Sequence, residues 1–226
     1  MKTVIDFHSH ILPGADHGSD SLKTSVKQLE YARNCGVKVI VATSHFYPDK
    51  TTVASYLSRR NSAYCELSTS HGESLPRIIL GAEVLVCHGM ERLDDINKLF
   101  IGDTNLLLLE LPLGERAPVH MGTIEALLKM GIKIVLAHID RYEKSLIDTY
   151  LSLGCLAQVN AEGVLKPFAA KRYKSLIREG KLVAIGSDIH GDNPKAHANL
   201  LRALSKLGED ANTLLSATAD LLSIKV

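Results

Sequence analysis

Seven short apolar runs alternate along this chain with longer amphipathic segments, and no other feature of the sequence limits the fold as strongly. The runs occupy residues 3–7, 37–43, 77–84, 105–111, 132–138, 155–160 and 181–187. Continuous apolar strands separated by amphipathic helices are typical of a parallel sheet that helices cover. The alternation therefore predicts an α/β fold, either an open doubly wound sheet or a closed barrel.

The intervening segments have helical periodicity, and several of them end at a glycine, which often terminates a helix. We expect helices over residues 21–36, 53–68, 119–131, 168–180, 194–208 and 209–223. The segment after Met90 is shorter and less regular.

A histidine or an acid lies within or directly after six of the seven apolar runs. These residues are Asp6, His8, His10, His45, Glu83, Glu110, His138, Asp188 and His190. In a parallel barrel the carboxyl ends of all strands converge on one mouth, whereas opposite edges of an open sheet lie far apart. The distribution therefore favours the barrel.

Each of these residues has an ordinary explanation when it is taken alone. His8 and His10 are two positions apart, so in a strand they share one face and can grip one ion, but most such pairs bind no metal. A buried carboxylate is costly unless it is paired or metal-bound, so the two acids inside apolar runs could equally form salt bridges.

Together the residues point to metal, because six strands would otherwise carry such groups at the same end by chance. Imidazoles and carboxylates without thiolates suit Mn²⁺, Fe or Zn²⁺ in multinuclear hydrolytic sites. Four other histidines lie in a polar loop (His71), beside helical segments (His88 and His120) or on a late helix (His197). We expect none of these four to be a ligand.

Composition excludes several other functions. The net charge of +1 argues against nucleic-acid binding, and the apolar runs are too short for membrane insertion. Four dispersed cysteines and the absence of a signal-peptide pattern predict a reducing, cytoplasmic location. No cysteine begins the C-x5-R loop of a cysteine-dependent phosphatase, and no P-loop or serine-hydrolase motif is present. We expect residues 1–226 to form a single domain.

The motifs resemble those of a known superfamily. The segments IDFHSHILPGADHG, VATSHF, LGAEV, LLLLELP, LAHIDRY and IGSDIHG are similar, in order and spacing, to the polymerase and histidinol phosphatase (PHP) superfamily. Within it they most resemble the bacterial manganese-dependent protein tyrosine phosphatases of the capsule and exopolysaccharide type. The resemblance covers nearly the whole chain and implies a distorted TIM-like (β/α)7 barrel with three divalent ions at its mouth.

The resemblance also implies how the ligands divide among the three ions, for which Mn²⁺ is expected, with Fe or Zn²⁺ as alternatives. The assignments are His8, His10, Glu83 and Asp188 for the first, Glu83, Glu110 and His138 for the second, and His45, His190 and a residue of the first loop for the third. That loop ends Asp-Asp-Gly in the family, with the second Asp as ligand. Here it reads Asp16-His17-Gly18, so His17 takes the ligand position and Asp16 is the alternative.

Three further residues are expected to assist the reaction. Arg141 matches the phosphate-binding Arg of the family's AHPER motif, which reads AHIDR here. Lys195 stands where the branch carries a second Arg, and a lysine cannot make the bidentate fork of a guanidinium to phosphate. Asp6 is expected to orient His8 or its neighbour from behind, as carboxylates often do for metal-bound imidazoles.

The expected activity is hydrolysis of phosphotyrosine in a protein by a metal-bridged hydroxide, with a bacterial tyrosine kinase of polysaccharide biosynthesis as the candidate substrate. Three alternatives stay open. One is a small-molecule phosphatase of the same superfamily, similar to histidinol phosphatase. Another is an amidohydrolase, which also begins with His-x-His but offers no natural place for the two glutamates. The last is a metal-binding regulator without turnover.

Overall fold

Strands and helices alternate along residues 3–69 and 75–224, which are the residues described in this computed structural model. The strands are β1 (Val4–Ser9), β2 (Val37–Ala42), β3 (His45–Phe46), β4 (Arg77–Leu80), β5 (Glu83–Leu85), β6 (Leu106–Glu110), β7 (Lys133–Leu136), β8 (Leu156–Asn160) and β9 (Leu182–Gly186). The α-helices are α1 (Leu22–Asn34), α2 (Val53–Thr69), α3 (Met121–Lys129), α4 (Lys144–Ser152), α5 (Ala161–Leu165), α6 (Ala170–Arg178), α7 (Lys195–Leu207) and α8 (Glu209–Leu221). Three short 3-10 helices, η1 (Met90–Arg92), η2 (Ile96–Leu99) and η3 (Ile139–Arg141), lie in connecting segments.

The strands form a seven-stranded parallel barrel, as the sequence predicts. Two sheets, ordered β1-β2-β4 and β3-β5-β6-β7-β8-β9, contain only parallel pairs. They are continuous, because β3 extends β2 after a two-residue break and β5 extends β4 in the same way. The ring is closed where the N–H of Asp188 donates to the carbonyl of His8 (2.8 Å) and Ser9 pairs with Ile189.

Side chains at alternate strand positions fill the barrel. Leu106 and Leu108 of β6 belong to a buried cluster whose members come from the strands, the segment before β6 and helix α8. The remaining core residues lie in a larger cluster that includes the inner faces of most of the helices. Glu110 continues the inward face of β6, and Glu83 is paired in register with Leu108, so both carboxylates lie above the apolar filling.

A change of register in β1 brings the first two histidines to the same interior. Asp6 pairs with Ile40, whereas Ser9 pairs with Ala42, so three steps along β1 match two steps along β2. Such a bulge turns side chains to the other face and is common beside active sites. Phe7 points into the apolar cluster, and because of the bulge His8 and His10 point into the same interior.

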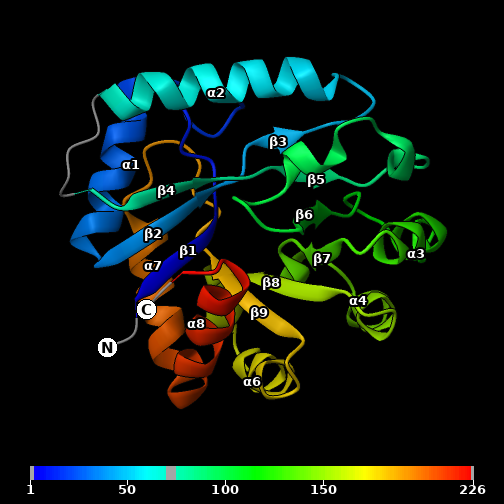
Figure 1. The fold of residues 1–226 in the computed structure, drawn as a ribbon. Coiled ribbons are helices and arrows are strands. Elements are labelled where there is room, and N and C mark those ends of the chain that lie inside the picture. Colours follow the sequence, from blue (N-terminus) through cyan, green and yellow to red (C-terminus); the bar gives the residue numbers. More distant parts are fainter. Residues whose placement is uncertain (1–2, 70–74, 225–226) are drawn as a thin grey trace.

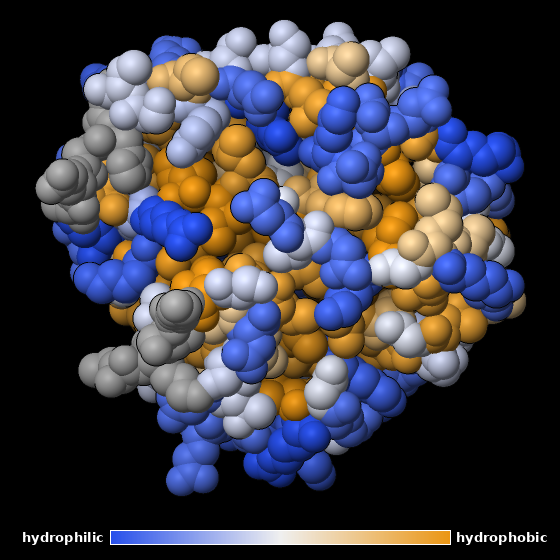
Figure 2. Space-filling model, viewed as in Figure 1, coloured by the Kyte–Doolittle hydropathy of each residue, from blue (hydrophilic) through white to orange (hydrophobic). Residues whose placement is uncertain are grey.

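The helices surround the strands, and Figure 1 shows them as an outer ring. On the face seen there, hydrophobic side chains collect over the middle and hydrophilic ones around the edge (Figure 2). Within the described ranges, no helix has both the length and the apolar character needed to cross a membrane. Two helices, α4 and α5, were not expected from the sequence; α4 fills the segment after the LAHIDRY motif.

Gly186 permits the close approach of β9 to β1 beneath the mouth. A Cβ there would lie 2.5 Å from His8 Cβ and 2.9 Å from the His8 backbone nitrogen, closer than real contacts allow. We expect Gly186→Ala to lower the free energy of unfolding, measured by urea denaturation, by about 1–3 kcal/mol. Gly122→Ala, on α3 with open space around it, is the matched control and should be neutral or stabilising. Equal stability of the two variants would contradict this packing.

Candidate metal centre

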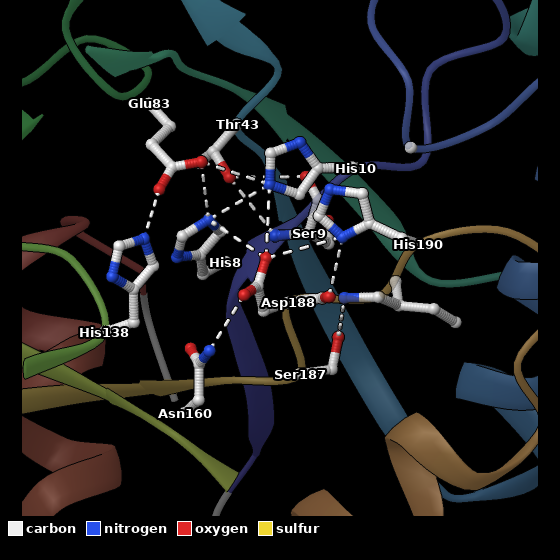
Figure 3. Close-up of polar contacts among 12 residues, drawn as sticks. His8, Ser9, His10, Thr43, Glu83, His138, Asn160, Ser187, Asp188 and His190 are labelled. Carbon is white, nitrogen blue, oxygen red and sulfur yellow. Dashed lines mark hydrogen bonds and ion pairs between the residues drawn. The ribbon is translucent and has the colours of Figure 1, made fainter. Parts of the chain in front are cut away.

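The predicted ligands converge at the carboxyl ends of the barrel strands. Figure 3 shows His8, His10, Glu83, His138, Asp188 and His190 directed toward one another from β1, β5 and the segments after β7 and β9. His8, His10 and His138 are fully buried, and Glu83 is nearly so. The barrel thus brings together residues that are up to 182 positions apart in the sequence, between His8 and His190.

Four of these side chains enclose a point suited to one ion. His8 Nε2 lies 3.1 Å from His10 Nε2, 3.1 Å from Glu83 Oε2 and 3.6 Å from Asp188 Oδ1. His10 Nε2 lies 3.2 Å and 3.3 Å from the same two oxygens. Tetrahedral ligands about 2.0–2.2 Å from an ion are about 3.3–3.6 Å apart, so this spacing fits a metal.

A second group lies on the other side of Glu83. Glu83 Oε1 is 2.7 Å from His138 Nε2, and Glu110 Oε1 is 3.5 Å from the same nitrogen. His45 Nδ1 is 3.0 Å from Glu83 Oε2 and 3.8 Å from Glu110 Oε2. Glu83 therefore lies between the two groups with one carboxylate oxygen toward each, as a bridging ligand would. His45 was assigned only to the third ion, yet it also borders this second group.

A third group gathers imidazoles. Ligand atoms of His10, His45 and His190 lie within 4.8 Å of one another. The exposed ring of His17 lies over the rings of His45 and His190, with centroids 4.8 Å from each. The loop therefore brings His17 to the rim of this group.

The neighbouring Asp16 has a different position. Its Oδ2 is 2.7 Å from His10 Nδ1 and accepts the backbone N–H of His45 at 2.9 Å, while its Oδ1 accepts the N–H of Gly18 at 2.8 Å. Both oxygens of Asp16 are thus occupied in orienting the loop and His10. This leaves the Nε2 of His10 for a ligand, and leaves His17 as the loop side chain that faces the third group.

The donor set fits metal ions because it is incomplete without them. Glu83 Oε2 is buried and surrounded by nitrogens of His8, His10 and His45, yet it has no hydrogen bond of acceptable geometry. His45 Nδ1 is equally buried and unpartnered. Unsatisfied buried charges are costly, and metal coordination is one of the few ways to satisfy such a group.

The electrostatics of the pocket also call for positive charge. Burial alone would lower the pKa of His8, but Glu83 and Asp188 outweigh it and raise that pKa. Burial also acts to lower the pKa of His10, but Asp16, Asp188 and Glu83 outweigh it and raise that pKa well above its usual range. The pKa of Glu83 is lowered by His8 and its other imidazole neighbours despite burial.

The more peripheral groups respond differently. Burial, aided by the positive charge of His10, lowers the pKa of His190 to about 4. Burial and the neighbouring Glu83 raise the pKa of Glu110. The carboxylates thus favour positive charge at His8 and His10, whereas burial favours the neutral form of His190.

Two amides of β8 support the centre and were missed by sequence reasoning. Gln158 Oε1 lies 3.3 Å from His8 Nδ1 and accepts the N–H of His138 at 2.6 Å. Gln158 Nε2 donates to Asn160 Oδ1 (3.0 Å), and Asn160 Nδ2 donates to Asp188 Oδ2 (2.8 Å). Their signal was two polar residues, two positions apart, in 155–160, the one apolar run without a histidine or an acid.

Asp6 does not hold the imidazole of His8, contrary to expectation. It accepts the backbone N–H of His8 (3.3 Å) and of Ser187 (2.8 Å), and its Oδ2 lies 3.0 Å from Nε2 of the fully buried His197. The carboxylate thereby fastens β1 to the end of β9 and to α7. Gln158 is the group that faces the outer nitrogen of His8.

The two expected phosphate-binding residues differ in position. Arg141, 39% exposed, contacts Asp188 Oδ2 through one guanidinium nitrogen, Nη2, at the edge of the ligand cluster. Lys195 is the exposed first residue of α7, where its backbone N–H donates to Asn193 Oδ1. The described contacts connect Arg141, but not the ammonium of Lys195, with the ligand cluster.

The remaining histidines lie apart from the ligand groups. His71 falls outside the described residues. His88 is exposed with its ring 4.8 Å from that of the buried His120, whose pKa is lowered by burial. His197 is a structural partner of Asp6 rather than a substrate contact.

Two ligand positions have a strained backbone. His138 and Asp188 have φ angles of 31° and 51°, in the left-handed region that few residues other than glycine adopt. Each lies two positions beyond the end of its strand, β7 or β9. Such strain costs about 1–3 kcal/mol per residue and is concentrated at functional sites, where it aims a side chain.

Comparison with known proteins assigns the chain to a family. A family model described as capsular polysaccharide synthesis, CpsB/CapC, matches residues 4–218. The chain belongs to the CpsB/CapC family. Two relatives of this CpsB/CapC chain are named tyrosine-protein phosphatase CpsB: one from Streptococcus pneumoniae, 27% identical over 208 residues, and one from Streptococcus agalactiae, 25% identical over 201 residues. Each match covers 83% of both sequences.

Solved structures share the fold of the CpsB/CapC chain. A structure reported with YwqE from Bacillus subtilis and CpsB from Streptococcus pneumoniae, described as metal-dependent tyrosine phosphatases, superposes with a TM-score of 0.79 at 22% identity. The match covers 99% of this chain and 96% of that one. A β-aspartyl dipeptidase from Fervidobacterium islandicum matches 98% of this chain and 75% of its own at 15% identity and a TM-score of 0.54. Both likenesses concern the fold.

The raised pKa values of His8 and His10 predict how pH affects stability. Protonation of these imidazoles stabilises the metal-free fold fully below about pH 6.5, and this contribution is lost as pH rises through their raised values. Metal binding requires the same nitrogens without protons, so it strengthens with pH. We expect the difference in thermal midpoint between Mn²⁺-loaded and EDTA-stripped protein to widen from about pH 6 to about pH 9. A difference independent of pH would contradict the assignment of these nitrogens as ligands.

Proposed function

We propose that this CpsB/CapC protein hydrolyses phosphotyrosine in protein substrates at a centre of three divalent ions. The observation that carries the proposal is Glu83, a buried carboxylate whose Oε2 has three imidazole neighbours and no hydrogen bond. Arg141, a half-exposed cation at the edge of that centre, adds a group suited to phosphate. The names of the CpsB relatives support the same reaction and substrate class.

The ligands would divide among the ions according to the three groups of the centre. We assign His8, His10, Glu83 and Asp188 to the first ion, Glu83, Glu110 and His138 to the second, and His45, His190 and His17 to the third. His45 also reaches the second group and His10 the third, so adjacent ions would share an environment. Nitrogen and carboxylate donors without thiolates suit Mn²⁺, with Fe or Zn²⁺ as alternatives.

Bound ions would supply Lewis-acid charge for the phosphoryl oxygens and would lower the pKa of a coordinated water to about 7. The chain's own contribution is to position these groups. Arg141 keeps most of its guanidinium N–H groups available for phosphate oxygens while Asp188 holds one nitrogen. Asn160 and Gln158 fix Asp188 and His8, so the geometry is set before substrate arrives. A tyrosyl oxygen, with a pKa of about 10, leaves with modest assistance.

We propose a tyrosine kinase of polysaccharide biosynthesis as the substrate, since the family description is capsular polysaccharide synthesis. A cytoplasmic location is consistent with four free cysteines. A small phosphomonoester such as histidinol phosphate remains the alternative substrate, and a regulator without turnover the alternative role. We expect one domain, residues 1–226, to carry the activity.

Assays with Mn²⁺ on a phosphotyrosine peptide, a phosphoserine peptide, histidinol phosphate and a phosphodiester test the proposal directly. We expect the phosphotyrosine peptide to have the highest kcat/KM. Arg141→Lys should lower that kcat/KM by about 10–100-fold, because lysine loses the planar fork to phosphate. Hydrolysis of histidinol phosphate in preference to phosphotyrosine would overturn the substrate assignment, and no turnover of any substrate would favour the regulator.

His17→Ala tests the third ion. If His17 is a ligand, elemental analysis after desalting should show about one ion fewer per chain than in the wild type, since removal of one of three ligands weakens binding strongly. His88→Ala, which removes an exposed histidine elsewhere, should retain the full metal content. Unchanged metal content in His17→Ala would show that His17 is not a ligand and that Asp16 or water takes this position instead.

A further inference from the structure

A groove of about 700 Å³ runs between α4 and α6 on the outside of the barrel. The two helices are neighbours in the outer ring of Figure 1, and Arg172 of α6 joins them through Asp148 of α4 at 2.9 Å. The floor includes the apolar side chains of Leu151 and Leu176. The residues that line the groove are not members of the ligand cluster. The metal centre therefore does not account for them or for their charge.

The groove is strongly cationic. Five basic and two acidic side chains line it, although the whole chain has a net charge of only +1. Arg178 and Lys181 are neutralised by Asp210 and Glu179. Lys144 and Lys171, both exposed, have no carboxylate within ion-pair distance among residues 3–69 and 75–224.

Phe168 stands at the same groove and is unusual in two ways. Its side chain is 97% exposed, the most exposed large hydrophobic group among the described residues, so it adds nothing to the core. Its φ angle of 59° lies in the left-handed region, which is costly for an aromatic residue. The preceding turn is held by Lys206, whose ammonium donates to the carbonyls of Leu165 and Lys166 at 3.1 and 3.0 Å. Backbone strain is concentrated at functional sites and aromatic side chains are enriched at interfaces, so Phe168 is a candidate contact for a ligand.

The entrance of the groove is connected to the segment that carries Arg141. Lys166, two residues before Phe168, donates to the carbonyl of Asp140 at 3.3 Å, and Asp140 precedes the phosphate-binding candidate Arg141. Lys144, at the start of α4, follows Arg141 by three residues. A chain whose phosphorylated residue reached Arg141 could therefore continue over Phe168 and into the groove.

We propose that the α4–α6 groove, with Phe168 at its entrance, binds an acidic segment that flanks the phosphotyrosine of the protein substrate. The unpaired ammonium groups of Lys144 and Lys171 match carboxylates, and Phe168 with the apolar floor matches aliphatic or aromatic side chains between them. This inference rests on the proposed phosphotyrosine activity. It adds a substrate class: proteins with acidic residues near the phosphorylated tyrosine.

The test compares three substrates: free phosphotyrosine, a phosphotyrosine peptide with acidic flanks, and the same peptide with Gln in place of each acid. At low salt the wild type should have a kcat/KM about three- to tenfold higher for the acidic peptide than for the Gln peptide. Lys144→Glu combined with Lys171→Glu should abolish this preference and leave kcat/KM for free phosphotyrosine unchanged. Both changes place an acid in the first turn of a helix, where it is tolerated.

Two controls separate binding from folding. Lys38→Glu makes one such charge reversal at an exposed position near the start of β2 and should keep the preference. Phe168→Gly removes the aromatic ring but relieves the left-handed strain, so its thermal midpoint should not fall. Its kcat/KM for both peptides should fall.

Each outcome distinguishes the two proposals. No wild-type hydrolysis of free phosphotyrosine or of either peptide would overturn the phosphatase assignment itself. Hydrolysis with equal kcat/KM for both peptides, or a preference that survives in the Lys144→Glu/Lys171→Glu variant, would overturn the groove proposal alone. The wild type could instead lack a peptide preference and sediment with phosphatidylglycerol vesicles when this variant does not. That result would reassign the groove to binding of an anionic lipid surface.

Discussion

The carboxylate of Glu83 is almost completely buried, and many side chains at the barrel mouth are arranged around its negative charge. A bare carboxylate there would be strongly destabilising, so the chain surrounds it with imidazoles from β1, β3 and the end of β7. The carboxylates raise the pKa values of His8 and His10, so proton binding by these imidazoles offsets negative charge when no metal is bound. The same demand for positive charge makes the pocket suited to divalent cations and, through Arg141, to phosphate.

The fold and most of the centre were accessible from the sequence because each rests on a local pattern. Apolar strands alternate with amphipathic segments, and parallel strands necessarily bring their carboxyl ends to one side. Any His, Asp or Glu at those ends must then meet, whatever the sequence distance. The resemblance to the PHP superfamily added the grouping of Glu110 with His138, and their side chains lie 3.5 Å apart.

The parts that the sequence left unpredicted depend on particular three-dimensional contacts. The bulge that turns His8 inward arises from the pairing of β1 with β2, which no periodicity reveals. Asp6 was expected to orient His8 or its neighbour, but the closure of the barrel by the end of β9 brings Ser187 to its carboxylate, and His197 of α7 lies against it too. Gln158 was overlooked since a single amide in a strand carries little chemical signal until its neighbours are known.

The left-handed backbone at His138 and Asp188 has an evolutionary consequence. Glycine adopts this conformation without the steric cost that a side chain meets, so the proposed ligand at each position stands where glycine would be more stable. A descendant that no longer needed metal would gain stability from glycine there. In related sequences, glycine at either position would therefore indicate loss of metal chemistry rather than neutral drift. A histidine or an aspartate there would indicate that selection maintains the metal chemistry.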